Sequence, residues 1–120
     1  MLFNVFKSQE ERRAFGGSAF VEIQFCELPT GTREKKLVSI NSINHWKSDS
    51  LYLYVEDLDT FYQEYNPIFD CDLYGINYYA PSLIDSIIEK LNTDKPTDFE
   101  KLIAWLNVAK QHNGFYILGI

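Results

Sequence analysis

The sequence holds few of the residues that build disulfide frameworks and metal sites. Its 120 residues include two cysteines, Cys26 and Cys71, which lie far apart and form no CxxC pair. This spacing excludes a disulfide scaffold and a cysteine zinc site, and it predicts two reduced thiols. The two histidines, His45 and His112, also lack the spacing of a metal-binding motif. We therefore expect no cofactor and no bound metal.

Long hydrophobic runs are lacking as well. No apolar stretch approaches the roughly 20 residues that a membrane-spanning helix needs. The N-terminal segment, residues 1–7, has neither the basic region nor the small-residue cleavage site of a signal peptide. We expect a cytoplasmic protein that makes no contact with a membrane.

The sequence does contain enough apolar residues for one packed core. Hydrophobic residues make up 46% of the chain and aromatic residues 16%, whereas disordered chains are poor in aromatics. A chain of this length corresponds to about one ordinary domain. Because there is no internal repeat or linker, we predict a single domain over residues 1–120.

The first half of the chain has the patterns of β-strands. Apolar and polar residues alternate over residues 21–26, which is typical of a half-buried strand. A turn over residues 28–32 precedes residues 36–41, which we interpret as the return strand. Residues 51–55 are rich in the aromatic and apolar types that favour strands.

The second half of the chain has more helical patterns. A short helix capped by Asp57 or Asp59 is predicted to end at Pro67, because proline interrupts helices. Residues 72–79 are expected to be extended. Pro81 then opens a helix whose apolar residues share one face.

The C-terminal segment adds a further helix and a closing strand. Thr97 and Glu100 have the spacing of a capping box at a helix start, and the apolar stripe continues to about His112. Residues 115–118 form the last predicted strand. This order predicts an α+β fold, a mainly antiparallel sheet with two or three helices packed on one face.

Negative charge is concentrated in the middle of the chain. The formal net charge is -6, but residues 48–89 contain nine acidic side chains and no lysine or arginine. The same segment holds seven of the eight tyrosines. Acidic groups without nearby cations attract basic partners, and tyrosine is enriched in the centres of protein interfaces.

These two features predict a binding surface for a basic protein. It consists of six carboxylates and four tyrosines: Glu56, Asp57, Asp59, Glu64, Asp70, Asp72, Tyr62, Tyr65, Tyr74 and Tyr78. The alternative is an ordinary solvated acidic face with some tyrosines in the core. Direct binding of nucleic acid is not expected, because neutralising phosphates requires a basic stripe that this chain lacks.

No sequence motif indicates catalysis, so we do not expect an enzyme. The alternative hypothesis is a small hydrolase that uses His45 or His112 with Cys71. Asp70 and Asp72 flank this cysteine, and neighbouring carboxylates raise the pKa of a thiol, which makes it a poor nucleophile.

Four segments of the chain carry a resemblance to a known family, residues 43–47, 51–61, 74–79 and 114–120. They resemble bacterial immunity proteins, the partners of polymorphic or contact-dependent growth-inhibition toxins. The resemblance implies a cytoplasmic protein, monomeric outside its complex, that binds one cognate toxin domain and blocks it. Many such toxins are nucleases with basic surfaces, which an acidic inhibitor complements. A third hypothesis is a self-associating protein that pairs through residues 115–120.

Overall fold

The computed structural model describes residues 2–14, 19–44 and 46–119. Its centre is a four-stranded antiparallel sheet in the order β2-β1-β4-β3. The strands are β1 (Phe20–Phe25), β2 (Leu51–Tyr54), β3 (Ile76–Tyr79) and β4 (Phe115–Leu118).

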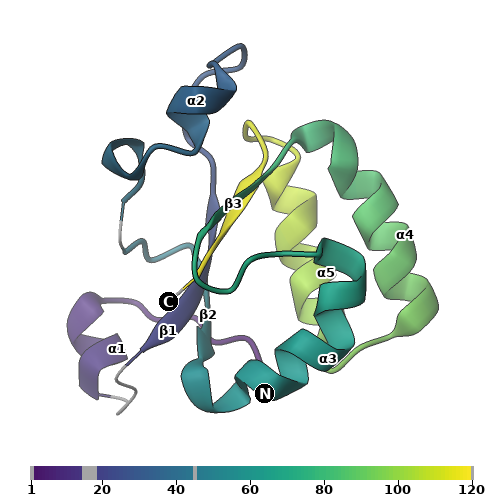
Figure 1. The fold of residues 1–120 in the computed structure, drawn as a ribbon. Helices are drawn as coiled ribbons and strands as arrows, with labels where there is room; N and C mark the ends of the chain where they lie inside the picture. The colour runs from purple at the N-terminus through teal and green to yellow at the C-terminus, as the bar shows by residue number, and fades with distance from the viewer. Residues whose placement is uncertain (1, 15–18, 45, 120) are drawn as a thin grey trace.

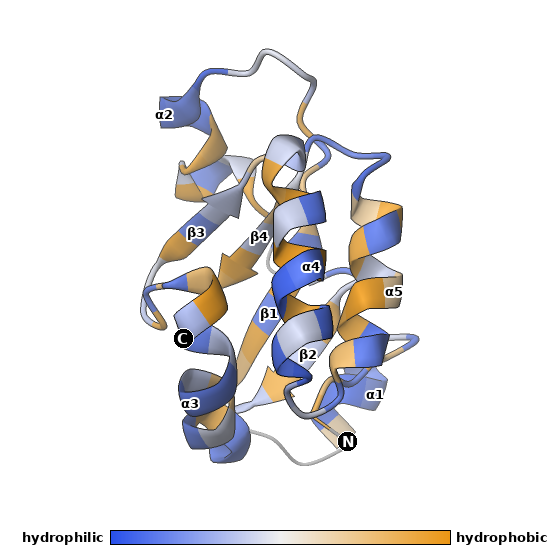
Figure 2. Cartoon of the chain, turned by 90° about the vertical axis from the view of Figure 1, so that its right-hand side faces the viewer, coloured by the Kyte–Doolittle hydropathy of each residue, from blue (hydrophilic) through white to orange (hydrophobic). Residues whose placement is uncertain are grey.

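Three longer helices cover one face of the sheet. They are α3 (Leu58–Phe69), α4 (Ile84–Asp94) and α5 (Phe99–Ala109). Figure 1 places them together on one side of the strands, and Figure 2 shows α4 and α5 side by side in front of the sheet. The predicted α+β class, with helices packed on one face of an antiparallel sheet, is confirmed.

Short helical segments lie elsewhere in the molecule. They are α1 (Gln9–Ala14), α2 (Glu34–Leu37) and the 3-10 turns η1 (Ile40–Ser42), η2 (Val55–Asp57) and η3 (Pro81–Leu83). The segment around α2 and η1 contacts the sheet face opposite α3, α4 and α5.

The main core lies between the sheet and its three helices. Val21, Ile23 and Phe25 of β1 point into it, because alternate residues of a strand share one face. Phe25 stacks on Trp105 of α5 at a centroid distance of 4.0 Å. Fully burying one large apolar side chain contributes roughly 1.5–3 kcal/mol, so this layer supplies most of the stability of the fold.

The other face of β1 is buried as well, so the prediction of a half-buried strand is wrong. Glu22 and Gln24 are only 5% and 3% exposed, and Cys26 is fully buried. A second, smaller core covers this face with Cys26, Leu37, Ile43 and Tyr116.

The predicted return strand over residues 36–41 is also wrong. Its first residues belong to α2 and its last residues to η1. Both edges of β1 are occupied, one by β2 and the other by β4, so no further strand pairs with it. The Lys35-Lys36 pair is also compatible with a helical turn.

Two predicted features of helix ends differ from the structure. Helix α3 continues past Pro67 to Phe69, and it ends where Asp70 adopts a left-handed backbone with φ of 49°. Pro67 is exposed in the last turn, where its ring removes only one hydrogen bond of the helix. The capping box is wrong too, because Thr97 bonds to Glu64 and α5 begins after Asp98 without a side-chain cap.

The C-terminal strand is not a free edge. β4 pairs with β1 on one side and with β3 on the other, so its backbone has no open side for another chain. The hypothesis of self-association through residues 115–120 is therefore wrong for β4, and residue 120 lies outside the described residues.

Candidate functional site

The predicted carboxylates lie on α3 and on the segments at its two ends. We call these six residues, Glu56, Asp57, Asp59, Glu64, Asp70 and Asp72, the acidic α3 surface. The ion pairs found among the described residues involve only Lys47 and Lys110, so none of the six carboxylates is paired with a cation. Their negative field is therefore not neutralised locally.

One stripe of α3 combines acidic, polar and aromatic groups. Asp59, Tyr62, Asn66 and Asp70 follow one another at three- and four-residue spacing, which places them on one helix face. Tyr62 is 55% exposed. An open hollow of about 420 Å³ is lined by Tyr62, Asn66 and Asp70 of this stripe, together with Gln63 and Pro67. A tyrosine ring beside unpaired carboxylates suits contact with lysine or arginine side chains.

Glu64 is the carboxylate of this surface that joins α3 to a distant part of the chain. Its Oε1 accepts hydrogen bonds of 2.9 Å from both the backbone N–H and the hydroxyl of Thr97. Thr97 lies in the connection between α4 and α5, so this contact fixes α3 to the other two helices.

A tight turn after α3 presents Tyr74 to solvent. The Asp72 side chain accepts a hydrogen bond of 2.9 Å from the Tyr74 N–H. The Asn77 side chain closes the turn by donating to the Asp72 carbonyl and accepting from the Asp72 N–H, both at 2.8 Å. Tyr74 is 78% exposed, which makes it the most exposed of the four candidate tyrosines.

The other two candidate tyrosines point toward the interior, Tyr65 fully buried and Tyr78 half-buried. Tyr65 is fully buried in the main core, and its hydroxyl donates to the Thr97 carbonyl at 2.5 Å. Tyr78 packs against Tyr116 on the opposite sheet face, and its hydroxyl donates to the Asn113 carbonyl at 2.6 Å. Burial raises the pKa of both hydroxyls. Of the four candidate tyrosines, only Tyr62 and Tyr74 are therefore exposed enough to contact a partner.

The surroundings of Cys71 do not favour nucleophilic chemistry. Its Sγ lies 3.4 Å from Asn66 Oδ1, and burial, followed by the charges of Asp70 and Asp72, raises its pKa to about 11. At neutral pH the thiol is therefore protonated. His112 stacks on Phe25 at 4.6 Å, and His45 lies outside the described residues. Across the described chain, no group of three or more potential ligands could hold a metal ion.

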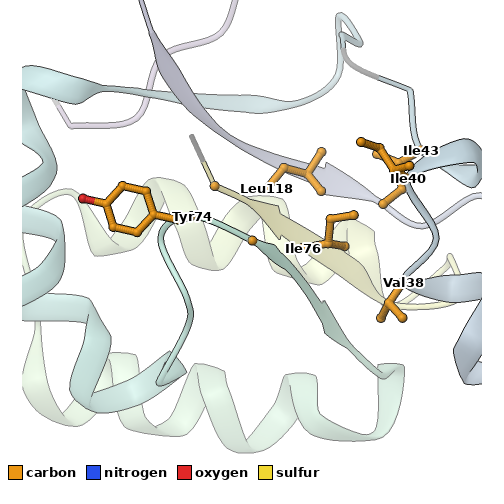
Figure 3. Close-up of a pocket in the computed structure, with 8 residues that line it drawn as sticks. Val38, Ile40, Ile43, Tyr74, Ile76 and Leu118 are labelled. Carbon is orange, nitrogen blue, oxygen red and sulfur yellow. The ribbon is translucent and has the colours of Figure 1, made fainter.

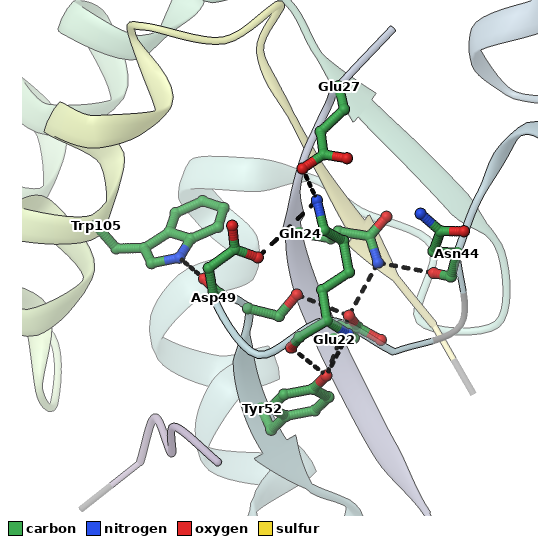
Figure 4. Close-up of polar contacts among 9 residues, drawn as sticks. Glu22, Gln24, Glu27, Asn44, Asp49, Tyr52 and Trp105 are labelled. Atoms are coloured by element: carbon green, nitrogen blue, oxygen red, sulfur yellow. Dashed lines mark hydrogen bonds and ion pairs between the residues drawn. The ribbon is translucent and has the colours of Figure 1, made fainter. Parts of the chain in front are cut away.

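The sequence did not reveal a buried polar cluster on the second sheet face. Glu22 Oε2 accepts hydrogen bonds from Gln24 at 2.9 Å and from Ser50 at 2.7 Å, and the Tyr52 hydroxyl lies 3.2 Å away (Figure 4). Gln24 also donates to the Asn44 carbonyl at 2.7 Å. The alternating pattern of β1 predicts that Glu22 faces solvent. The pattern could not show its burial, because the donors Ser50 and Tyr52 come from a distant part of the chain.

An apolar groove also lies on this face. Its cavity has a volume of about 620 Å³. Figure 3 shows Ile40 and Ile43 together on one side, Ile76 and Leu118 in the middle, and the Tyr74 ring pointing away from them. The lining residues are Val38, Ile40, Ile43, Tyr74, Gly75, Ile76, Leu118 and Gly119. The groove was not predicted, because residues 38–41 were assigned to a strand.

Comparisons with known proteins give no relative from which a role could be transferred. No protein-family model matches the sequence, and neither the curated proteins nor the solved structures give a significant match. Within residues 2–14, 19–44 and 46–119, the structure has no helix with the length and apolar character needed to cross a bilayer.

Proposed function

We propose that this chain is an immunity protein, which binds a cognate toxin domain and neutralises it through the acidic α3 surface. The partner is a basic protein, in the first instance a nuclease domain. The proposal also implies that binding takes place in the cytoplasm, where such a toxin acts. The sequence resemblance supports this class of partner, and the charge distribution supports the surface.

One observation carries the proposal. The acidic α3 surface holds six carboxylates without a cationic partner in the described structure, spread along α3 and its two ends; Tyr62 is exposed on this helix and Tyr74 in the turn that follows it. Like charges held together without counterions oppose folding slightly, so such an arrangement is favoured when a partner supplies the opposite charge. A nuclease provides that charge, because it binds phosphates with lysine and arginine.

Inhibition follows from competition for the same basic surface. Carboxylates that approach the phosphate-binding residues of a nuclease occupy the place of its nucleic acid substrate. The exposed tyrosines supply contact area that excludes water from these charge pairs. The acidic side chains should therefore set the rate of association, and the tyrosines the rate of dissociation.

The test is a calorimetric titration of this protein with the toxin domain encoded immediately upstream, at two salt concentrations. We expect tight binding that weakens as salt rises. The triple variant Asp57→Lys, Asp59→Lys, Asp70→Lys should bind at least about 100-fold more weakly, and the Tyr62→Ala variant about 30-fold more weakly.

A matched control separates local from general charge effects. The triple variant Glu10→Lys, Glu34→Lys, Glu100→Lys changes the net charge equally but alters exposed residues outside the acidic α3 surface. It should retain binding within a few-fold. Equal losses in both triple variants would reject this surface, and no binding by the unaltered protein would reject the proposed partner.

A further inference from the structure

The two edges of the sheet differ in how they are covered. The outer side of β2 is closed by the N-terminal segment, where Asn4 and Tyr52 exchange backbone hydrogen bonds of 2.9 and 2.8 Å. β3 forms the opposite edge, and no other strand in the described parts of the chain pairs with its outer side. Open edges of this kind are sites where further strands add.

The register shows which backbone groups of β3 face outward. The Gly119 N–H donates to the Gly75 carbonyl at 2.8 Å, so Gly75 faces β4. Because strand residues alternate in direction, Asn77 and Tyr79 also face β4, opposite Ile117 and Phe115. The N–H and C=O groups of Ile76 and Tyr78 therefore point away from the sheet.

The edge is uncharged and carries none of the side chains that usually block pairing. Residues 73–84 contain no charged side chain, although 23% of the whole chain is charged. Natural proteins commonly block open edges with lysine or with proline inside the strand. β3 has neither.

The surroundings of this edge are apolar and accessible. The apolar groove lies on the face to which the Ile76 side chain points, and its Ile40 is 62% exposed (Figure 3). Tyr74, 78% exposed, precedes the strand. Exposed apolar groups next to an unpaired backbone gain free energy when another strand covers them.

We propose that β3 pairs with β3 of a second copy of this chain, antiparallel and across a two-fold axis at Asn77. The outward groups allow this register, in which Ile76 of each copy lies opposite Tyr78 of the other. Each of these pairs exchanges two backbone hydrogen bonds. The two four-stranded sheets then form one continuous sheet, with both apolar grooves on the same face.

Charge favours a second copy over the basic partner at this edge. Each copy carries a net charge of -6, so two copies repel one another wherever acidic residues meet. The uncharged segment 73–84 keeps carboxylates out of the contact itself, which lessens that repulsion, and it offers a basic protein no attraction. The proposed dimer differs from the monomer expected from the sequence. It also uses β3 as the pairing strand, in place of the C-terminal strand β4 that the sequence suggested.

The first experiment measures mass and amide exchange of the unaltered protein at several concentrations. Sedimentation equilibrium should show the mass rising toward twice 14.0 kDa between about 10 µM and about 1 mM, as expected for a contact smaller than stable interfaces. Hydrogen exchange of the Ile76 and Tyr78 amides should slow over the same range. The Asn77 and Tyr79 amides, which bond to β4, should be protected throughout.

A pair of variants at one position tests the backbone pairing. Ile76→Pro removes an outward N–H that the dimer needs, so it should abolish the dimer. The variant should still fold, because proline is tolerated at an edge strand when its missing N–H faces solvent. Ile76→Ala removes the side chain but keeps the N–H, and should still dimerise. Equal behaviour of the two variants would overturn the proposal.

The unaltered protein alone can also overturn it. A constant monomer mass, or exchange at Ile76 and Tyr78 that does not change with concentration, would exclude self-pairing even if the proline variant does not fold. Protection of these amides only when the toxin domain is added would assign the edge to that partner and reject the second copy. Toxin binding through the carboxylates of the acidic α3 surface and Tyr62 does not depend on this result, whereas Tyr74 takes part in both proposed contacts.

Discussion

At the scale of single residues, the second sheet face depends on one buried carboxylate. Glu22 lies at hydrogen-bond distance from Gln24, Ser50 and the Tyr52 hydroxyl. An isolated buried charge costs several kcal/mol, and these donors offset that cost. The Tyr52 hydroxyl is also 2.8 Å from the Lys47 carbonyl, so the cluster fixes the segment before β2.

The change Glu22→Leu should test this cluster. Leucine keeps a similar volume but takes the acceptor from the Ser50 hydroxyl, while Gln24 and Tyr52 keep the Asn44 and Lys47 carbonyls, so the free energy of unfolding should fall by about 2 kcal/mol. Urea denaturation followed by circular dichroism measures the loss. Glu10→Leu, at an exposed position of α1, is the control and should change stability by less than about 0.5 kcal/mol. Equal stabilities of the two variants would contradict a structural role for the carboxylate.

At the scale of the elements, the start of β4 depends on a glycine. Gly114 has φ of 84°, a backbone conformation that other residues adopt only with strain. A Cβ atom there would overlap the Tyr79 carbonyl at the end of β3. The Gly114 carbonyl accepts the Cys26 N–H at 3.0 Å, so this position joins three strands of the sheet.

The change Gly114→Ala should therefore lower the free energy of unfolding by about 3 kcal/mol, from backbone strain and from the overlap together. Gly31→Ala separates the two causes, because Gly31 has φ of 90° but no atom within 4 Å of an added Cβ. That variant should lose only about 1 kcal/mol. Thermal unfolding compares the two, and an equal loss would show that the contact with Tyr79 does not matter.

The elements that the sequence predicted well are those with local causes. The apolar residues of α4 recur every three or four positions, and Ile84, Ile87 and Leu91 are all buried. The segment 36–41 has the composition of a strand, but a strand needs a free neighbour, and β1 has none. The charge of the candidate site was visible in the sequence. The burial of Tyr65 and Tyr78 was not, because packing between distant elements decides it.

At the scale of the whole molecule, ionisable hydroxyl and thiol groups are distributed through both cores. Tyr65, Tyr79 and Cys71 contact the helix-covered face, whereas Tyr52 and Tyr116 lie on the other face. Burial is the largest cause that raises the pKa of each group, and nearby negative charges raise it further for most of them. The folded protein therefore keeps these groups neutral at pH values where an unfolded chain ionises them.

This difference predicts that alkali destabilises the fold over a defined range of pH. A thiol or hydroxyl whose pKa is higher in the folded than in the unfolded protein stabilises the fold as long as it stays neutral. This stabilisation is complete at pH values below the unfolded pKa, which is near 8.5 for cysteine and 10 for tyrosine. Above that value each group should lower the free energy of unfolding by about 1.4 kcal/mol per pH unit. For Cys71 this loss ends near pH 11, and for the tyrosines it continues beyond.

Urea denaturation at a series of pH values from 7 to 12 measures this effect. Stability should be nearly constant to about pH 8.5 and then fall ever more steeply as the tyrosines join Cys71. Tyrosinate absorbance from the buried residues should rise together with unfolding, because their hydroxyls ionise only once exposed. In Tyr65→Phe the slope above pH 10 should be smaller by the contribution of one group, while loss of the bond to Thr97 costs about 1 kcal/mol at neutral pH. A stability that stays level to pH 11 would mean that these hydroxyls are open to solvent in the folded protein.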